Sequence, residues 1–225
     1  MLGIAIPAHD EEAHIAAAVR AAMAAGRHAA LGGEPCEVVV ALDACTDATG
    51  ELARAAGART VALDARNVGV ARALAAQALV EAGARWLAFT DADTRVAPDW
   101  LADQLALGAD AVCGCVAVDD WSCHGADAER LHAHFLATYN DRDGHRHIHG
   151  ANLGVSTALY LQVGGFKHLA CSEDVDLVRA IERTGARIAW SARPRVLTSA
   201  RRQARAVGGF ADALLQALAM PAGGV

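Results

Sequence analysis

Aromatic side chains are scarce in this sequence: they make up only 4% of its 225 residues, whereas hydrophobic residues as a whole make up 54%. The hydrophobic content is enough for a sizeable core, but much of it is alanine, which favours helices and adds little volume. The core must therefore be built mainly from Leu, Val and Ile. A chain of this length is typical of one α/β domain, and we expect a single domain over residues 1–225.

Positive charge and long apolar runs are also lacking. The formal net charge is −6 and no basic block is present, so we expect no nucleic-acid partner. No stretch of about 20 apolar residues occurs, so we expect no transmembrane segment. The opening residues, "MLGIAIPAHDEE", lack the basic start and apolar run of a signal peptide, and we therefore expect a cytoplasmic protein.

The six cysteines lack the spacing of a zinc site. Cys113 and Cys115 would share one face of a strand, but no second pair is placed to complete a set of about four ligands. We therefore interpret the cysteines as reduced, structural thiols, the usual state in the cytoplasm.

The first half of the sequence alternates between short apolar runs and alanine-rich helical stretches. The predicted strands are residues 2–6, 37–42, 59–63 and 86–90, and the predicted helices between them are residues 11–25, 46–56 and 69–83. Strands that alternate with helices of this length indicate βαβ units. We therefore expect an α/β fold with a mostly parallel central sheet.

The second half is less regular. The predicted strands are residues 109–118 and 186–191, and the predicted helices are residues 126–139, 156–163, 172–185 and 209–220. The helix at 172–185 has Ser172 as its expected N-cap, acidic residues in its first turn and Gly185 as its stop.

Polar residues follow all four strands of the first half. The first strand runs into "PAHDEE", the second into "DACTD", the third into "DARNVG" and the fourth into "DAD". Because ligands bind at the carboxyl ends of the strands in such sheets, these loops predict a binding site at one edge. Asp91 and Asp93, in the last of these loops, repel each other unless water or a cation lies between them.

Motifs along the chain resemble those of family 2 glycosyltransferases. They are "IPAHDEE", "ALDACTD", "RNVGVARALA", "FTDADTRVAPDWL", "GGF" and "SEDVDLVRAIERTG", in the order and spacing of that family, roughly over residues 3–190. The resemblance implies a GT-A fold, which is a Rossmann-like α/β/α sandwich, and transfer of a sugar from a nucleotide-sugar donor. Residues 1–108 would form the nucleotide-sugar-binding half, and residues 109–225 the acceptor-side half.

The D-x-D of Asp91 and Asp93 is the expected metal site. A nucleoside diphosphate is a poor leaving group until its charge is neutralised, which a divalent cation achieves as a Lewis acid. Mg²⁺ or Mn²⁺ suits carboxylate oxygens and leaves positions open for phosphate. By resemblance, Asp93 ligates the metal and Asp91 contacts the ribose or a metal-bound water. The alternative is a solvated type I turn.

Three further acidic positions follow the first two strands. By resemblance, Asp43 recognises the base, and its acceptors suit the imide N–H of uracil or the N–H groups of guanine. A UDP- or GDP-linked donor is therefore expected. Asp10 and Glu11 could instead interact with the dipole of the following helix.

Arginines near the donor edge could pair with a phosphate. Arg66 and Arg72 are the candidates, with Gly69 allowing close approach of the backbone, and a surface salt bridge is the alternative for either arginine. The full expected donor set is Pro7, Ala8, His9, Asp10, Glu11, Asp43, Arg66, Asn67, Gly69, Arg72, Asp91, Ala92 and Asp93.

An inverting transfer needs a base that removes the proton of the acceptor hydroxyl. The family's Glu-Asp motif matches Glu173 and Asp174. We expect Asp174 to be the base and Glu173 to belong to the catalytic set. The alternative is that both only interact with the dipole of their helix.

The stretch "GHRHIHG" is open to three interpretations. On a strand, His145, His147 and His149 would share a face. They could ligate a metal, contact an anionic acceptor or form a solvated polar face. We expect His149, Gly150 and Asn152 on the acceptor side.

Some GT-A enzymes supply a late histidine to the metal, but no histidine follows the Glu-Asp helix here. A late positive patch is present instead, formed by Arg201, Arg202 and Arg205. It could cover the diphosphate, or it could be a solvated helix start.

These observations predict a metal-dependent, inverting glycosyltransferase with a UDP- or GDP-linked donor and an unidentified acceptor. One alternative is a nucleotidyltransferase-like enzyme, which would usually carry a glycine-rich loop and a basic residue where this chain has "PAHDEE". The other is a non-catalytic nucleotide-sugar-binding protein, against which Asp93 and Asp174 argue.

Overall fold

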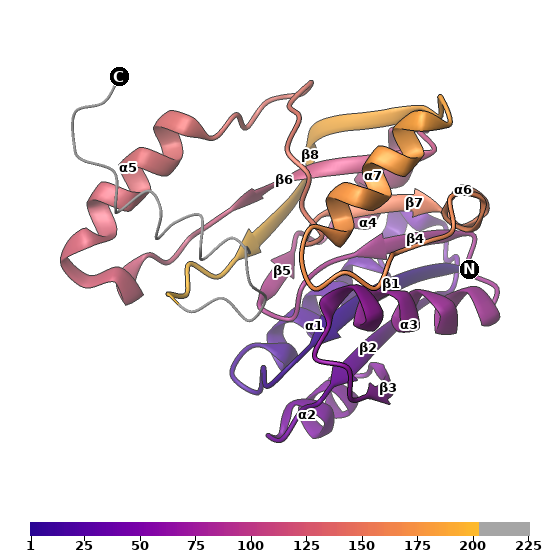
Figure 1. The fold of residues 1–225 in the computed structure, drawn as a ribbon, viewed down its shortest axis with the longest axis horizontal. Coiled ribbons are helices and arrows are strands. Elements are labelled where there is room, and N and C mark those ends of the chain that lie inside the picture. The colour runs from indigo at the N-terminus through magenta and orange to yellow at the C-terminus, as the bar shows by residue number, and fades with distance from the viewer. Residues whose placement is uncertain (203–225) are drawn as a thin grey trace.

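A single mixed sheet runs through both predicted halves of the chain (Figure 1). The structure, a computed structural model, describes residues 1–202, so the predicted helix at 209–220 lies outside it. The strand order is β3-β2-β1-β4-β7-β6-β8-β5. The strands are β1 (Leu2–Ala8), β2 (Cys36–Asp43), β3 (Arg59–Leu63), β4 (Trp86–Phe89), β5 (Thr94–Val96), β6 (Ala111–Ala117), β7 (Leu153–Ser156) and β8 (Ile188–Thr198).

The direction of the strands confirms the predicted α/β fold with a mostly parallel sheet. Strands β1, β2, β3 and β4 form a parallel block, and β8 runs parallel to β6. Among the strands of residues 1–202, only β5 and β7 run antiparallel to their neighbours. The carboxyl ends of β1 to β4 therefore meet at one edge of the sheet.

Helices cover both faces of the sheet. They are α1 (Ile15–Ala25), α2 (Thr49–Ala55), α3 (Val68–Glu81), α4 (Trp100–Ala106), α5 (Ala128–Thr138), α6 (Thr157–Gln162) and α7 (Glu173–Arg183). Buried side chains of α1, α2 and α4 pack on one face, and those of α3, α6 and α7 pack on the other. The result is a three-layer sandwich. No described helix is both long enough and apolar enough to cross a membrane.

Alanine lets α3 lie close to the sheet. Ala71, Ala75 and Leu79 of this helix are buried, and the Leu79 methyls lie 3.0 Å from the position that a Cβ would take on Gly3 of β1. Helix α5 differs, because Leu131 is its only buried residue, and it lies apart from the other helices at the left of Figure 1.

The sequence pattern did not predict β5, α4 or β7. Strand β5 has three residues and β7 has four, too few for a periodic signal. Strand β8 is longer than the predicted 186–191. Gly185, with a φ of 75°, follows α7 as predicted, but Ser172 does not cap it. Ser172 takes a φ of 58° and makes no side-chain cap hydrogen bond, so that prediction was wrong.

Candidate active site

The loops after β1 and β2 are tied together at the carboxyl edge of the sheet. The His9 Nδ1 atom lies 2.7 Å from the carbonyl oxygen of Asp43. Asp10 accepts a 2.7 Å hydrogen bond from the Thr46 N–H, and this bond lowers the pKa of the Asp10 carboxyl. The Asp47 carboxylate accepts a 2.9 Å hydrogen bond from the Thr49 N–H at the start of α2. The strand ends are therefore one connected polar region.

The Asp43 side chain stabilises the loop between β3 and α3. Its Oδ1 atom accepts hydrogen bonds from the N–H groups of Ala65 and Arg66, both at 2.8 Å, and its Oδ2 atom accepts one from Asn67 at 2.7 Å. The residue is only 4% exposed. Sequence reasoning missed this structural role, and it leaves one lone pair of Oδ2 for the expected contact with a nucleotide base.

The amino end of α3 is closed by the chain itself. Asn67 caps the helix by accepting a 3.1 Å hydrogen bond from the Val70 N–H, and its amide donates to the His168 carbonyl at 3.2 Å. A Cβ on Gly69 would lie 2.3 Å from the Lys167 carbonyl oxygen. Gly69, which was expected to allow close approach of the backbone in the donor set, therefore admits the segment before α7.

Arg72 joins the D-x-D turn to the start of α7. Its buried guanidinium forms ion pairs with Asp91, which follows β4, and with Glu173, the first residue of α7. Asp91 is partly exposed, whereas Glu173 is buried. Both terminal nitrogens of Arg72 thus face carboxylates of the protein, while its Nε atom is buried without a hydrogen-bond partner, so the guanidinium is not placed to bind a phosphate. Glu173 holds Arg72 and does not line an open surface.

Asp93 lies beside a different arginine. The Arg201 Nη2 atom is 3.1 Å from the Asp93 Oδ2 atom, and Arg201 also pairs with Glu11 after β1. Burial raises the pKa of Asp93 to about 6, with Arg201 opposing the shift and Asp91 and Glu11 adding to it. Arg201 from the late positive patch therefore lies at the D-x-D turn. Arg202 is exposed, and Arg205 lies outside the described residues.

Asp174 follows Glu173 at the same junction and is partly exposed. Its Oδ2 atom accepts a 2.7 Å hydrogen bond from the Gly150 N–H, and its Oδ1 atom accepts one of 2.8 Å from the Val175 N–H. A Cβ on Gly150 would lie 2.3 Å from the Arg72 Cζ atom. The glycine therefore lets this loop lie against Arg72 and reach Asp174.

Asn152 does not belong to the acceptor side, which corrects the sequence-based expectation. Its side chain is fully buried: it accepts from the Trp100 Nε1–H at 2.8 Å and donates to the carbonyls of Cys115 and Pro194 at 2.7 and 3.0 Å. These three hydrogen bonds link β6, β8 and α4 through Asn152. An acceptor could reach it only by breaking these bonds.

The three histidines of the 145–149 stretch form a ring stack outside any regular strand. His147 stacks on Tyr139 with ring centroids 4.1 Å apart, and the His147–His149 and His145–His147 centroids lie 5.8 and 5.4 Å apart. Tyr139 was not expected at the site, and no motif around it indicated a role. Within residues 1–202, no group of three or more His, Cys, Asp or Glu side chains is arranged to hold a metal ion.

The remaining donor candidates differ in exposure. Pro7 is half-buried, while Ala8 is buried at the end of β1 and Ala92 is buried between the two aspartates of the D-x-D turn. Arg66 is exposed, with a φ of 47°, and lines a shallow hollow of about 570 Å³ between α2 and the β3–α3 loop. That hollow adjoins the loop that Asp43 builds.

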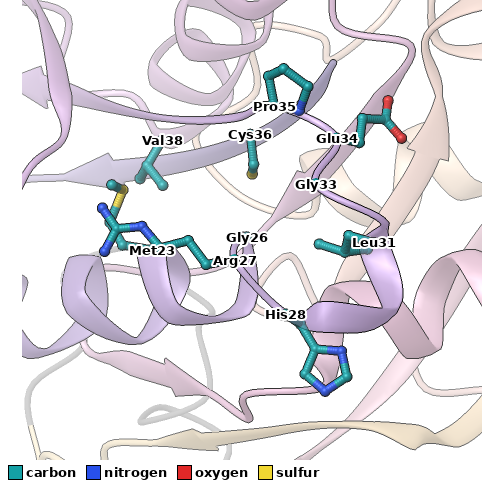
Figure 2. A pocket seen from close by; sticks show the side chains of 10 residues that line it. All are labelled: Met23, Gly26, Arg27, His28, Leu31, Gly33, Glu34, Pro35, Cys36 and Val38. Carbon is teal, nitrogen blue, oxygen red and sulfur yellow. The ribbon is translucent and has the colours of Figure 1, made fainter.

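A second cavity, of about 320 Å³, lies far from these residues. It is formed between the end of α1 and the start of β2, at the opposite edge of the sheet, and Figure 2 shows the Cys36 thiol pointing toward Gly26. Burial raises the pKa of Cys36 to about 11, so its thiol is protonated. This cavity has no connection with the carboxylates described above.

The family description "Glycosyl transferase family 2" matches residues 3–160 of this chain. The match covers well over half of the sequence and includes β1 to β4 and the D-x-D turn. The chain therefore belongs to glycosyl transferase family 2. No protein with a curated description matches it.

Solved structures with similar folds include three glycosyltransferase-related proteins. Residues 1–349 of S. aureus TarS in complex with UDP-GlcNAc share 16% identity over 93% of this chain and 61% of that one, with a TM-score of 0.66. The mannosyltransferase PcManGT from Pyrobaculum calidifontis, in complex with GDP-Man and Mn²⁺, shares 18% identity over 91% of this chain and 58% of that one, with a TM-score of 0.63.

The third is glucosyl-3-phosphoglycerate synthase from Mycobacterium tuberculosis in complex with phosphoglyceric acid. It shares 20% identity over 100% of this chain and 82% of that one, with a TM-score of 0.62. At these identities the likeness shows a common fold. This chain spans about three fifths of the TarS chain.

The donor set at the D-x-D turn fits a divalent cation whose other ligands come from phosphate. Mg²⁺ in particular is commonly bound through one or two carboxylates together with substrate phosphates. Asp93 is a buried carboxylate that burial makes costly to ionise, and Asp91 lies beside it. A cation would offset that cost, which Arg201 opposes in part.

Proposed function

We propose that this chain is a glycosyltransferase that uses Mg²⁺ or Mn²⁺ to move a sugar, with inversion, from a UDP- or GDP-linked donor to an acceptor hydroxyl. One observation carries the proposal: Arg72 joins Asp91 of the D-x-D turn to Glu173, the neighbour of Asp174. The D-x-D motif and the Glu-Asp motif are thereby held at one place. Family membership and the nucleotide-sugar complexes of the structural neighbours support it.

In this proposal Asp93 holds the cation, with Asp91 beside it. When bound, the cation would neutralise the charge of the nucleoside diphosphate as it leaves. Arg201, which lies against Asp93 and Glu11, would add positive charge at the same place. Arg72 contributes by orienting Asp91, because its guanidinium is already shared between two carboxylates.

Asp174 would take the proton of the acceptor hydroxyl. Each of its oxygens accepts one backbone hydrogen bond and keeps a lone pair. The carboxylate is therefore oriented and can still accept a proton. It lies in the first turn of α7, where the helix dipole interacts favourably with negative charge. The two-half division at residue 108 and the cytoplasmic location stay predictions.

Calorimetry tests the metal-dependent donor site. We expect UDP or GDP to bind in the presence of Mg²⁺ or Mn²⁺, to lose at least about tenfold in affinity in EDTA, and to bind Asp93→Ala as weakly as the EDTA-treated protein. Asp99→Ala is the matched control, because Asp99 is exposed beside α4. Equal affinity in EDTA would assign the neutralising role to Arg201 alone.

Turnover separates catalysis from binding alone. We expect release of UDP or GDP from a nucleotide sugar when an acceptor is supplied. A protein that binds these donors tightly but never releases nucleotide would be a non-catalytic binder.

A further inference from the structure

Tyr139 connects the interior of the second half with His149. Its phenol oxygen accepts a 2.9 Å hydrogen bond from the Val116 N–H of β6, and the same oxygen lies 2.9 Å from the His149 Nε2 atom. Burial raises the pKa of Tyr139 above its ordinary value, so the phenol keeps its proton.

The bond from Val116 decides where the Tyr139 proton goes. Because the oxygen already accepts one hydrogen bond from the backbone, its single O–H is left to donate. Two acceptors are in reach, the His149 Nε2 atom and the Cys115 sulfur. An imidazole nitrogen is a far better acceptor than a thiol, so the Tyr139 O–H donates to the Nε2 atom of His149. The proton of His149 itself must then lie on Nδ1.

His149 is held as a neutral ring. Burial lowers its pKa to about 4, with His147 and His145 adding to the shift and Asp91 opposing it. Since Tyr139 occupies Nε2 and a proton occupies Nδ1, neither nitrogen has a lone pair for a metal. This excludes metal ligation for His149 in this arrangement.

The Nδ1–H group is available to a ligand. It has no hydrogen-bond partner within residues 1–202 and is not among the fully buried, unpartnered polar atoms of that range, and the His149 residue as a whole is partly exposed. The next residue, Gly150, donates to Asp174 and lies against Arg72. His149 therefore stands on the loop that orients Asp174.

We propose that His149 donates a hydrogen bond from Nδ1 to an uncharged oxygen of the acceptor and so positions the acceptor hydroxyl beside Asp174. This inference rests on the proposed glycosyltransferase function and deepens it. A neutral imidazole offers one donor and no charge, which suits an uncharged hydroxyl oxygen of a sugar or polyol. A phosphate or carboxylate would gain more from a charged donor, because charge-assisted hydrogen bonds are about twice as strong as neutral ones.

NMR of the full chain without substrate tests the tautomer. In long-range ¹H–¹⁵N spectra at pH 7, with the His149 signals assigned by their loss in His149→Gln, we expect a protonated Nδ1 and an unprotonated Nε2. Tyr139→Phe should remove this preference. Tyr160→Phe should not, although Tyr160 also accepts a backbone N–H, from Phe166 at 3.1 Å. A protonated Nε2 in the wild-type protein would overturn the inference.

Kinetics test the acceptor contact. UDP-glucose and GDP-mannose serve as donor probes, with methyl glucosides, glycerol and their phosphate esters as acceptor probes, and nucleotide release is measured. We expect transfer to neutral probes, and His149→Ala to raise the acceptor KM by about three- to tenfold, the scale of one neutral hydrogen bond. The donor KM should stay unchanged, and His149→Asn, which keeps an N–H donor, should recover part of the loss.

The two levels of the proposal fail in different ways. Transfer only to the phosphate esters, or an acceptor KM unaffected by His149→Ala, would overturn the role of His149 and leave the glycosyltransferase function intact. If no donor is turned over at all, the proposed function fails, and the role of His149 as an acceptor contact fails with it, whatever tautomer NMR finds.

Discussion

The two sides of the candidate site bury their polar groups in different ways. At the proposed donor edge, carboxylates are held against arginines: Arg72 lies between Asp91 and Glu173, and Arg201 contacts Asp93. Around Tyr139, by contrast, uncharged rings stack on one another and hydrogen-bond to the backbone.

This difference has a physical consequence. Removing one partner of a buried ion pair destabilises the fold, because the remaining buried charge is left without compensation. A network of neutral rings is instead destabilised when a histidine is protonated, because burial disfavours the charged imidazolium. The stability of the proposed donor edge should therefore respond most to charge-removing substitutions, and that of the proposed acceptor side to pH.

Removing Arg72 should have the largest effect on stability. Arg72→Met leaves Asp91 and Glu173 without a partner, and we expect the free energy of unfolding in urea to fall by about 3–5 kcal/mol. Adding Glu173→Met should recover part of this loss. Arg85→Met is the control, since the pair of Arg85 with Glu34 is exposed and is worth about 1 kcal/mol at most. Equal losses in both variants would contradict the difference between the two kinds of pair.

Replacing the proposed base should affect rate more than binding. Asp174→Asn is nearly isosteric and can keep the bond from Gly150, so we expect near-native donor affinity and a loss of about 10²-fold or more in transfer. Asp176→Asn, in the same helical turn, should stay within a few-fold of wild type. If donor affinity of Asp174→Asn collapses together with the rate, Asp174 is a donor-site residue and the inverting mechanism loses its support.

Stability should fall in acid through His149. Its folded-state pKa of about 4 lies below the ordinary 6.5, so the unfolded chain binds the proton more readily. The contribution is fully present above pH 6.5 and is lost as the pH falls toward 4, amounting to about 2 kcal/mol between pH 7 and pH 5. Urea unfolding of wild type and His149→Gln at these two pH values measures it, with the exposed His132→Gln as control. The same pH dependence in all three proteins would place the titrating group elsewhere.

Nucleotide preference is the smallest effect expected. If the remaining lone pair of Asp43 meets an N–H of the base, UDP or GDP should bind at least about tenfold tighter than ADP or CDP. Competition calorimetry provides the ranking. Asp43→Asn should weaken every nucleotide, because the loop at 64–67 loses its anchor, whereas Asp64→Asn in the same loop should not. A ranking led by ADP would limit Asp43 to its structural role.

The sequence predicted the fold well where its pattern was long and local. The alternation of apolar runs and alanine-rich stretches was enough to predict β1 to β4 and the helices between them. It failed for β5 and β7, which have too few residues to show a period, and for Ser172, whose left-handed φ depends on the preceding loop.

The sequence alone thus determined the family, the layered α/β fold and the gathering of acidic loops at one edge of the sheet. Only the tertiary structure decided what each polar side chain does there. Asp43 hydrogen-bonds to the β3–α3 loop, and Arg72 forms ion pairs with two carboxylates. Arg201 forms an ion pair with Glu11, which is 190 residues away along the chain. The physical reason is that periodicity and turn chemistry act between near neighbours, whereas ion pairs and proton positions depend on which distant segments the packing brings into contact.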